Sequence, residues 1–407
     1  MSNDGLSMVV SVTSSKSTGI ANCTDAYITF TATSMEAFIV PFPAVITPPI
    51  VTTEVVVPVP VNMSDAATWY FQANGLQLFS FANDAAITLS NVIQTVATLL
   101  PEFNAHVPPE IAAMNIDFMA KYPQVIINAR DKSLNNPPDE SEVHSGDFFG
   151  IMRFDGLNPL LAWAMGSTTG HTTTALWIDG ELYVCESDIS SEFWPGDGIQ
   201  KTPYREWLKL ADAADYQVIW APLSAEARAL YNETAAVEFF KANEGFDYGF
   251  KTMIWGWIDT PDDNFPCLPP YPATENCMSW AMFEPLLAWV DFKVPAIGAM
   301  LWNAGVAMRL NVSDDLRTVD YYKIANDRGL SIHEDVISIP EEDTWLYNTT
   351  RYGEPAVGKN MVCCVFVCNM WKAAGVFTPI NNEVNCGEMT NWDDVSSYIY
   401  SLFFVDI

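Results

Sequence analysis

The chain has 407 residues, of which 49% are hydrophobic and 13% aromatic, so it is globular and long enough for two or three domains. It carries 19 basic residues against 50 acidic ones, a formal net charge of −31. Nucleic acids and anionic membranes are bound through clusters of Lys and Arg, so this charge argues against both and favours a cationic partner, unless the acidity serves solubility alone.

Residues 1–62 are rich in Val, Ile and Thr, and the runs VVSVTSS, AYITFTATS and TTEVVVPVPV predict strands. The most apolar stretch, residues 42–61, contains five prolines and a Glu, so no membrane-spanning helix is predicted. A helix is expected over residues 85–100. Residues 130–142 are polar and contain prolines, which is typical of a linker. We therefore expect a β-rich N-terminal region over residues 1–140, to which no chemistry can be assigned.

A hairpin is predicted further along the chain, after alternating strands and helices begin at residue 146. The segment HTTTALW starts at His171, Asp179 and Gly180 supply a tight turn, and LYVCE returns to Glu186. Counting outward from the turn brings His171 and Glu186 close to opposite one another. The carboxylate could then fix the imidazole tautomer, as in a catalytic triad, although an ordinary surface hydrogen bond would fit the same pattern.

A buried helix is predicted within MVCCVFVCNMWKAAG, residues 361–375, because its apolar residues recur at helical spacing and Gly375 suits the C-terminal cap. Cys363 and Cys364 lie at its first turn. The unpaired N–H groups and positive dipole of a helix N-terminus favour a thiolate, and the same N–H groups can hold an oxyanion. The alternative is that small apolar cysteines fill the core, which we prefer for Cys364 and Cys368.

The order of these segments resembles that of the permuted papain-like hydrolases of the NlpC superfamily, in particular its YaeF/YiiX type. The resemblance rests on Gly146-Asp147 before a strand, Gly170-His171 at the next strand start, and Glu186 at a strand end. Gly198-Ile199 before an aromatic helix also fits. The segment GFDYGF, residues 245–250, looks like the Gly-x-x-Tyr-Asp turn of the family.

The superfamily's nucleophile helix has an Ala-Gly pair whose Gly follows the Cys by twelve residues. Counting back from Gly375 selects Cys363 over Cys364. The chain departs from the family at Cys364, where Ser is usual, at Val365, and at Val362, where many relatives carry a polar or aromatic residue. The matching segments cover residues 146–250 and 361–377, under a third of the chain. The resemblance implies Cys363 as nucleophile, His171 as base and Glu186 as orienting group.

The predicted fold class is α+β: a permuted papain-like catalytic domain over residues 141–407, with an antiparallel sheet and packed helices, after the β-rich N-terminal region. An insert is expected at about residues 251–358. A cleft could be lined by five aromatic residues, which could equally be core: Trp194, Tyr204, Tyr248, Trp255 and Trp257.

The predicted function is that of a cysteine hydrolase, amidase or peptidase, acting on a peptide or N-acyl amide through a thioester, with no cofactor and no metal. Two alternatives stay open: a thiol acyltransferase, and a non-catalytic structural or binding protein that retains the fold. The sequence does not indicate the oligomeric state.

Cys267 and Cys277 bracket a proline-rich loop that could be closed by a disulfide, and five N-glycosylation sequons occur. Met1–Gly19 lacks the features of a signal peptide. From the cysteines we expect an extracellular or lumenal compartment.

Overall fold

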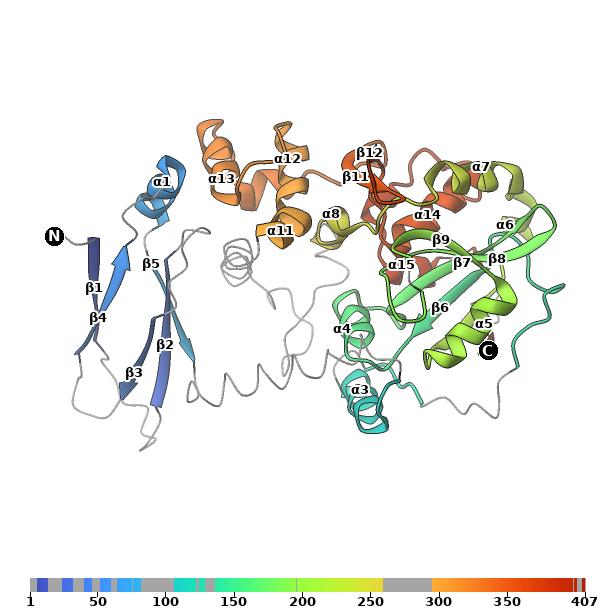
Figure 1. Cartoon of the computed structure of the whole chain (residues 1–407), viewed down its shortest axis with the longest axis horizontal. Coiled ribbons are helices and arrows are strands. Elements are labelled where there is room, and N and C mark those ends of the chain that lie inside the picture. Colours follow the sequence, from blue (N-terminus) through green and yellow to red (C-terminus); the bar gives the residue numbers. More distant parts are fainter. Residues whose placement is uncertain are drawn as a thin grey trace. The chain divides into compact units, whose positions relative to one another are not determined.

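The computed structural model describes residues 6–13, 24–31, 40–45, 52–59, 64–74, 76–81, 106–121, 124–128, 136–194, 196–258, 295–397, 399–400 and 405–406. By its internal contacts the chain divides into unit 1, residues 1–97 and 279–336, and unit 2, residues 98–278 and 337–407 (Figure 1). The predicted helix at residues 85–100 and the predicted Cys267–Cys277 bridge lie outside the described residues.

Unit 1 combines short antiparallel strands with helices. Strand β1 pairs with β4, and β3, β2 and β5 form a second sheet in that order. The Val- and Thr-rich runs of the N-terminal region account for β1, β2 and β4, since β-branched side chains suit a pleated surface. Its described elements are β1 Leu6–Thr13, β2 Thr24–Thr31, β3 Val40–Val45, β4 Thr52–Val59, α1 Asp65–Asn74, β5 Leu76–Phe81, α11 Pro295–Gly298, η3 Ala299–Asn303, α12 Ala304–Leu310, α13 Thr318–Asp327 and η4 Ile332–Val336.

Unit 2 is a mixed α/β fold built on an antiparallel sheet with packed helices, which confirms that part of the predicted fold class. Its strands are β6 Phe148–Met152, β7 His171–Ile178, β8 Glu181–Asp188, β9 Gly198–Pro203, β10 Gln217–Ala221, β11 Tyr347–Arg351, β12 Glu354–Gly358 and β13 Val405–Asp406. Its helices are α3 Pro109–Lys121, α4 Leu157–Ala164, α5 Tyr204–Ala213, α6 Ala225–Leu230, α7 Glu233–Asn243, α8 Phe250–Met253, α9 Trp255–Ile258, α14 Cys363–Ala374, η5 Cys386–Glu388 and α15 Asn391–Ser396.

The main sheet of unit 2 has the strand order β13-β10-β6-β7-β8-β9, and every neighbouring pair is antiparallel. Alternate residues of a strand point to opposite faces, so the sheet separates two apolar cores. Phe148 and Leu176 belong to one core, while Phe149 and Ala175 belong to the other.

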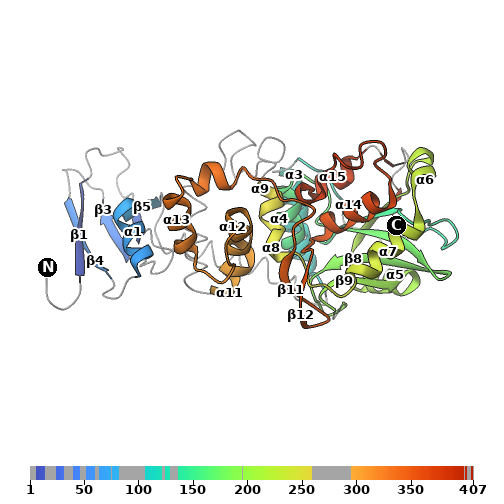
Figure 2. The same cartoon turned by 90° about the horizontal axis from the view of Figure 1, so that it is seen from above.

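Helices α14 and α7 cover the first face, where they lie side by side and pack on β7 (Figure 2). Phe366 and Met370 of α14 are fully buried there. Helix α5 covers the other face, and its Trp207 packs against Phe149, with ring centroids 5.6 Å apart. The helix predicted to be buried is α14. It forms because its strongly apolar segment fills the space above the strands on the first face.

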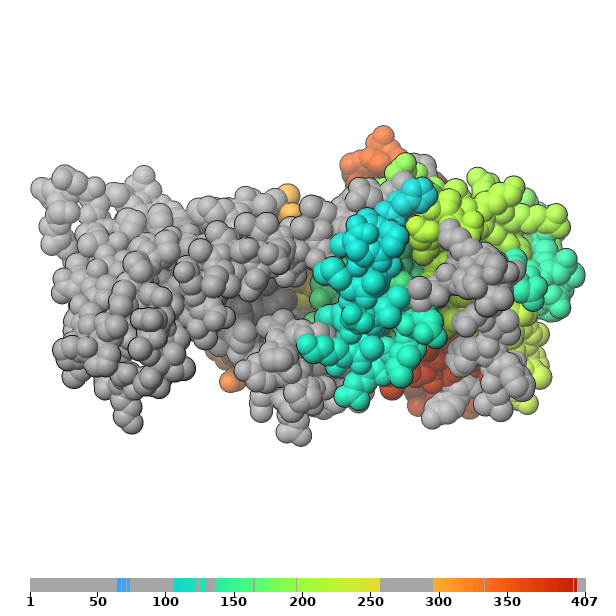
Figure 3. Space-filling model, turned by 90° about the horizontal axis from the view of Figure 1, so that it is seen from below, coloured from blue at the N-terminus to red at the C-terminus, as the bar shows by residue number. Residues whose placement is uncertain are grey.

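Helix α3 also belongs to unit 2, and Figure 3 shows it in cyan across the surface seen from below. Its Met119 is buried against Met152, Phe154 and Ala162. The chain was predicted to divide near residue 140, whereas these contacts group residues 98–140 with the main sheet. Residues 279–336, expected within the insert, group with unit 1.

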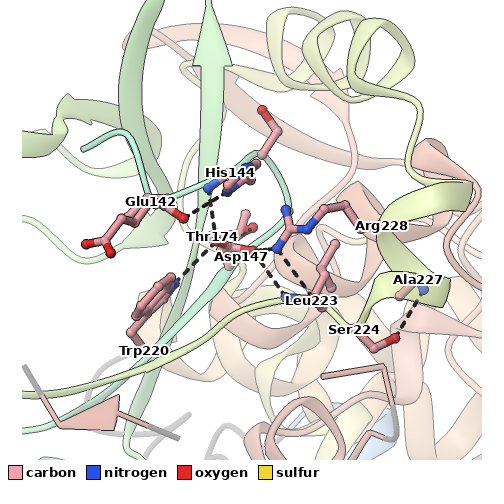
Figure 4. Close-up of polar contacts among 12 residues, drawn as sticks. Glu142, His144, Asp147, Thr174, Trp220, Leu223, Ser224, Ala227 and Arg228 are labelled. Carbon is pink, nitrogen blue, oxygen red and sulfur yellow. Dashed lines mark hydrogen bonds and ion pairs between the residues drawn. The ribbon is translucent and has the colours of Figure 1, made fainter. Parts of the chain in front are cut away.

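The Gly146-Asp147 dipeptide anchors the start of β6 to the segment that follows β10 and to α6 (Figure 4). The buried Asp147 carboxylate accepts hydrogen bonds from the backbone N–H of His144 (2.9 Å) and of Leu223 (3.1 Å), and it pairs with the Arg228 guanidinium at 2.6 Å. The Trp371 indole of α14 donates to the carbonyl oxygen of Gly146 at 2.9 Å. This dipeptide therefore fixes α14 relative to the sheet.

Candidate active site

The β7–β8 hairpin carries two of the three predicted catalytic residues. Asp179 and Gly180 have φ values of 53° and 86°, as the predicted two-residue turn requires. The ladder runs from the pair Ile178–Glu181 to the pair Thr174–Cys185. Extending this register puts Asp188 across from His171 and Glu186 on the diagonal. The three side chains therefore share one face of the hairpin.

His171 and Glu186 form a buried pair, with the imidazole Nε2 3.0 Å from the carboxylate Oε2. Burial alone would lower the pKa of His171, but the Asp188 charge and the hydrogen bonds to Cys363 and Glu186 raise it well above its ordinary value. The imidazole is therefore held as a cation. With Nε2 engaged by Glu186, Nδ1 is the ring nitrogen left to exchange a proton with another group.

The other histidines whose side chains the structure describes lie outside this cluster. His106 is exposed and lies 3.6 Å from Asp215, while His144 is exposed and contacts the Glu142 carbonyl oxygen. The side chain of His333 lies outside the described part of the chain. Of the three described imidazoles, only that of His171 is buried, which agrees with the choice of His171 by elimination.

Cys363 is the first residue of α14, and Gly375 ends that helix in the left-handed conformation with φ 81°. Its thiol is buried and hydrogen-bonded to the His171 imidazole. No side chain caps the N-terminus of α14, so no capping side chain competes for the N–H groups at the start of the helix.

The segment before α14 is fixed by contacts with β8 and with the 245–250 turn. The Met361 carbonyl oxygen accepts a hydrogen bond from the Ser187 hydroxyl at 2.7 Å and from the Gly249 N–H at 3.1 Å. A Cβ on Gly249 would lie 2.3 Å from the Met361 carbonyl carbon and 2.3 Å from the Val362 nitrogen. Only glycine at this position lets the turn approach the nucleophile helix so closely.

The pKa of Cys363 is held well below its ordinary value. A hydrogen bond from Cys364 is the largest cause; burial opposes it, and the His171 imidazolium and the Thr172 N–H add to the lowering. Because the β7–β8 ladder has ended by Thr172, this N–H can face the sulfur. Cys364 has a single proton, for which the Met389 carbonyl oxygen, 3.1 Å from its Sγ, competes.

Tyr248 lies in the turn that resembles the Gly-x-x-Tyr motif, and its hydroxyl is hydrogen-bonded to Cys363. Burial, followed by the charges of Cys363 and its neighbours, raises the pKa of Tyr248 well above its ordinary value. The hydroxyl is thus a neutral donor beside the sulfur. Of the other predicted cleft aromatics, Trp194 and Tyr204 belong to the core on the α5 face and Trp255 is fully buried, while the Trp257 side chain is not described.

Helix α15 brings two further polar residues to the nucleophile. Asn391 is fully buried; its amide donates to the Thr169 carbonyl oxygen at 3.3 Å, and its Oδ1 accepts from the Cys363 thiol at 3.6 Å. One turn later, burial and the Cys363 charge raise the pKa of Asp394 well above its ordinary value. Asn391 favours the thiol form of Cys363, whereas the imidazolium and the Thr172 N–H favour the thiolate.

A disulfide joins Cys368, in the second turn of α14, to Cys386 of η5, with Cα atoms 5.5 Å apart. It tethers the segment that leads to Asn391 to the nucleophile helix. Cys368 was predicted to be core only; it is indeed fully buried, but it is also a cross-link. Cys185, Cys363 and Cys364 are free thiols.

The ligand atoms of His171, Glu186 and Asp188 lie within 4.8 Å of one another. Among the described residues, this is the cluster that could hold a metal ion. Asp188 is half-buried, and its pKa is raised to about 6 by burial, against the lowering effect of His171. No sequence signal had singled out Asp188.

We compared the chain with protein-family models, with curated proteins and with solved structures, and none of them matches. No helix within the described residues is long and apolar enough to cross a membrane.

Proposed function

We propose that the protein is a cysteine hydrolase of the permuted papain-like type, acting on a peptide or N-acyl amide. The observation that carries the proposal is the buried chain of contacts from Glu186 through His171 to Cys363. A thiol with a lowered pKa, a cationic imidazole beside it and a carboxylate that orients the imidazole are the three parts of a thiol acyl-transfer site. Each lies on an element that other contacts fix.

In the proposed mechanism, the Cys363 proton resides on His171, and the thiolate attacks the amide carbonyl carbon. The negative charge that forms on the carbonyl oxygen requires nearby donors. The first-turn N–H groups of α14 and the Tyr248 hydroxyl can supply them, so Val362 need not contribute a polar side chain. His171 then protonates the departing amine, which leaves Cys363 as a thioester.

Water completes the cycle. His171, now neutral, accepts a proton from the attacking water, the carbon–sulfur bond of the thioester breaks, and the acid leaves as the thiolate–imidazolium pair re-forms. The role of the Glu186 carboxylate is to hold Nε2 and to stabilise the imidazolium.

The order of the chain supports the permuted form of the fold. The strand residues His171 and Glu186 come before the nucleophile Cys363 in the sequence, and α14 nevertheless packs on β7 and β8. The Cys368–Cys386 disulfide supports an extracellular or lumenal compartment, since structural disulfides persist where the surroundings are oxidising.

The test is formation of an acyl-enzyme. The native protein is incubated with a small activated acyl ester, and peptide mass spectrometry follows the acyl adduct on Cys363, with Cys363→Ala as control. A hydrolase forms the adduct and releases free acid. Transfer of the acyl group to an added amine or alcohol in preference to water would identify the acyltransferase. If acyl groups are found only on other nucleophiles, and equally in the wild type and in Cys363→Ala, the protein is a non-catalytic scaffold.

A further inference from the structure

The face of the β7–β8 hairpin that holds His171 carries more negative groups than one imidazole balances. Within the described chain, Glu186 forms an ion pair with His171 and with no Lys or Arg, and Asp188 has no ion-pair partner. Cys363 is hydrogen-bonded to the same imidazole. Two carboxyl groups thus face a single imidazole, and one of them, Glu186, is fully buried, where an unbalanced charge is costly.

Glu186 has unused coordinating capacity. Its side chain is fully buried, and its Oε2 contacts His171, but its Oε1 has no hydrogen-bond partner among the described residues. A buried carboxylate oxygen without a partner is unusual, since such oxygens are nearly always hydrogen-bonded or bound to a metal ion.

The spacing of the donors suits a small divalent cation. The donor atoms of His171, Glu186 and Asp188 lie within 4.8 Å of one another. Zinc bound about 2.0–2.2 Å from each donor holds its ligand atoms roughly 3.3–3.6 Å apart, so binding would draw the donors together by up to about 1.5 Å. Asp188 is the half-buried member of the three; its Oδ1 accepts a hydrogen bond from the Ile189 N–H at 2.8 Å, which leaves Oδ2 for the ion. One nitrogen and two carboxylate oxygens, with a fourth position open, form a ligand set that zinc accepts.

We propose that His171, Glu186 and Asp188 form a regulatory site for Zn²⁺, in which the metal ion takes Glu186 and the Nε2 atom of His171 out of the triad. The three side chains bind the ion without Cys363. Its effect on reactivity rests on the proposed function, because a zinc-bound imidazole is no longer the cation that stabilises the Cys363 thiolate. Zinc therefore reversibly silences the thiol.

The experiment has a binding arm and a reactivity arm. Zn²⁺ affinity is measured by competition with a zinc-responsive dye for the full-length wild type, Asp188→Asn, Glu186→Gln and Cys363→Ser. Glu181→Gln is the matched control, since Glu181 is exposed on the same strand. We expect one tight site in the wild type, in Glu181→Gln and in Cys363→Ser, with at least tenfold weaker binding in the other two variants.

In the reactivity arm, one equivalent of Zn²⁺ should slow iodoacetamide labelling of Cys363 at least tenfold at neutral pH, and a chelator should restore it. The proposal is overturned by tight binding that Asp188→Asn and Glu186→Gln leave unchanged, which would mean surface carboxylates, or by binding that Cys363→Ser abolishes. Slow labelling of Cys363 even without zinc would instead contradict the proposed function, whatever the binding arm shows.

Discussion

His171 and Glu186 meet on one face of the β7–β8 hairpin, just beyond the point where the two strands stop pairing, with Nε2 3.0 Å from Oε2. The open end of the ladder lets the Thr172 N–H face the sulfur of Cys363. The same hairpin thus positions the base, its orienting carboxylate and a donor to the nucleophile. The proposed chemistry depends on this geometry.

Replacing the carboxylate should weaken the base. Glu186→Gln keeps the side-chain shape but removes the charge that helps to hold His171 as a cation, so the pKa of His171 falls and that of Cys363 rises. We expect Cys363 alkylation at about pH 6 to slow roughly tenfold, the change that one pKa unit gives. Glu181→Gln on the same strand should label like the wild type. Equal rates for both variants would show that Glu186 does not orient His171.

The Tyr248 hydroxyl should stabilise the thiolate. Tyr248→Phe removes this donor and leaves the ring in place, so we expect the midpoint of the pH–alkylation profile of Cys363 to rise by roughly one pH unit, as loss of a hydrogen bond to a charged group would give. Tyr352→Phe, at a largely exposed tyrosine, serves as control. A profile that Tyr248→Phe leaves in place would remove Tyr248 from the site.

Gly249 should be required for stability. Its added Cβ would overlap the backbone of Met361 and Val362, which lead into the nucleophile helix, so Gly249→Ala should cost about 2 kcal/mol of unfolding free energy. Gly353→Ala is the comparison, because no described residue lies near its Cβ, although its φ of 79° costs about 1 kcal/mol. Urea denaturation of both variants measures the difference. A smaller loss in Gly249→Ala than in Gly353→Ala would mean that the turn can move away from the helix.

The Cys368–Cys386 bridge should contribute to stability. Its partners are 18 residues apart, and closing a loop of that length lowers the entropy of the unfolded chain, which stabilises the folded state by about 3 kcal/mol. The double variant Cys368→Ala/Cys386→Ala should therefore unfold at lower urea concentration than the oxidised wild type. If the wild type carries two additional free thiols under non-reducing conditions, the bridge does not form.

Local patterns predicted the parts of the site that lie within one element. The turn residues Asp179 and Gly180 were sufficient for the hairpin, and apolar spacing together with Gly375 was sufficient for the bounds of α14. Asp188 was missed because the count from the turn placed Glu186 where the true register places Asp188. A strand register is fixed by the whole sheet, so a small counting error changes which residue faces its neighbour.

Residues brought together by tertiary packing gave no signal in the sequence. Asn391 and Asp394 approach Cys363 only because α15 folds back over α14, and the Cys368–Cys386 bridge depends on the same return of the chain. The family resemblance, the activity and the compartment stay predictions. The domain limits were drawn from linker composition, whereas contacts across the fold group residues 98–140 with the sheet.

The central claim is a thiolate–imidazolium pair formed by Cys363 and His171. The pKa of Cys363 is lowered and that of His171 is raised, so the pair exists at pH values between the two pKa values. The thiolate is lost only as the pH falls through the lowered pKa of Cys363. The most direct measurement is the pH dependence of iodoacetamide labelling at Cys363, with His171→Ala as comparison. The account predicts rapid labelling at about pH 6, below the ordinary thiol range, and much slower labelling in the variant. A Cys363 that stays unlabelled in the native protein, or titrates like an ordinary thiol whether or not His171 is present, would contradict it.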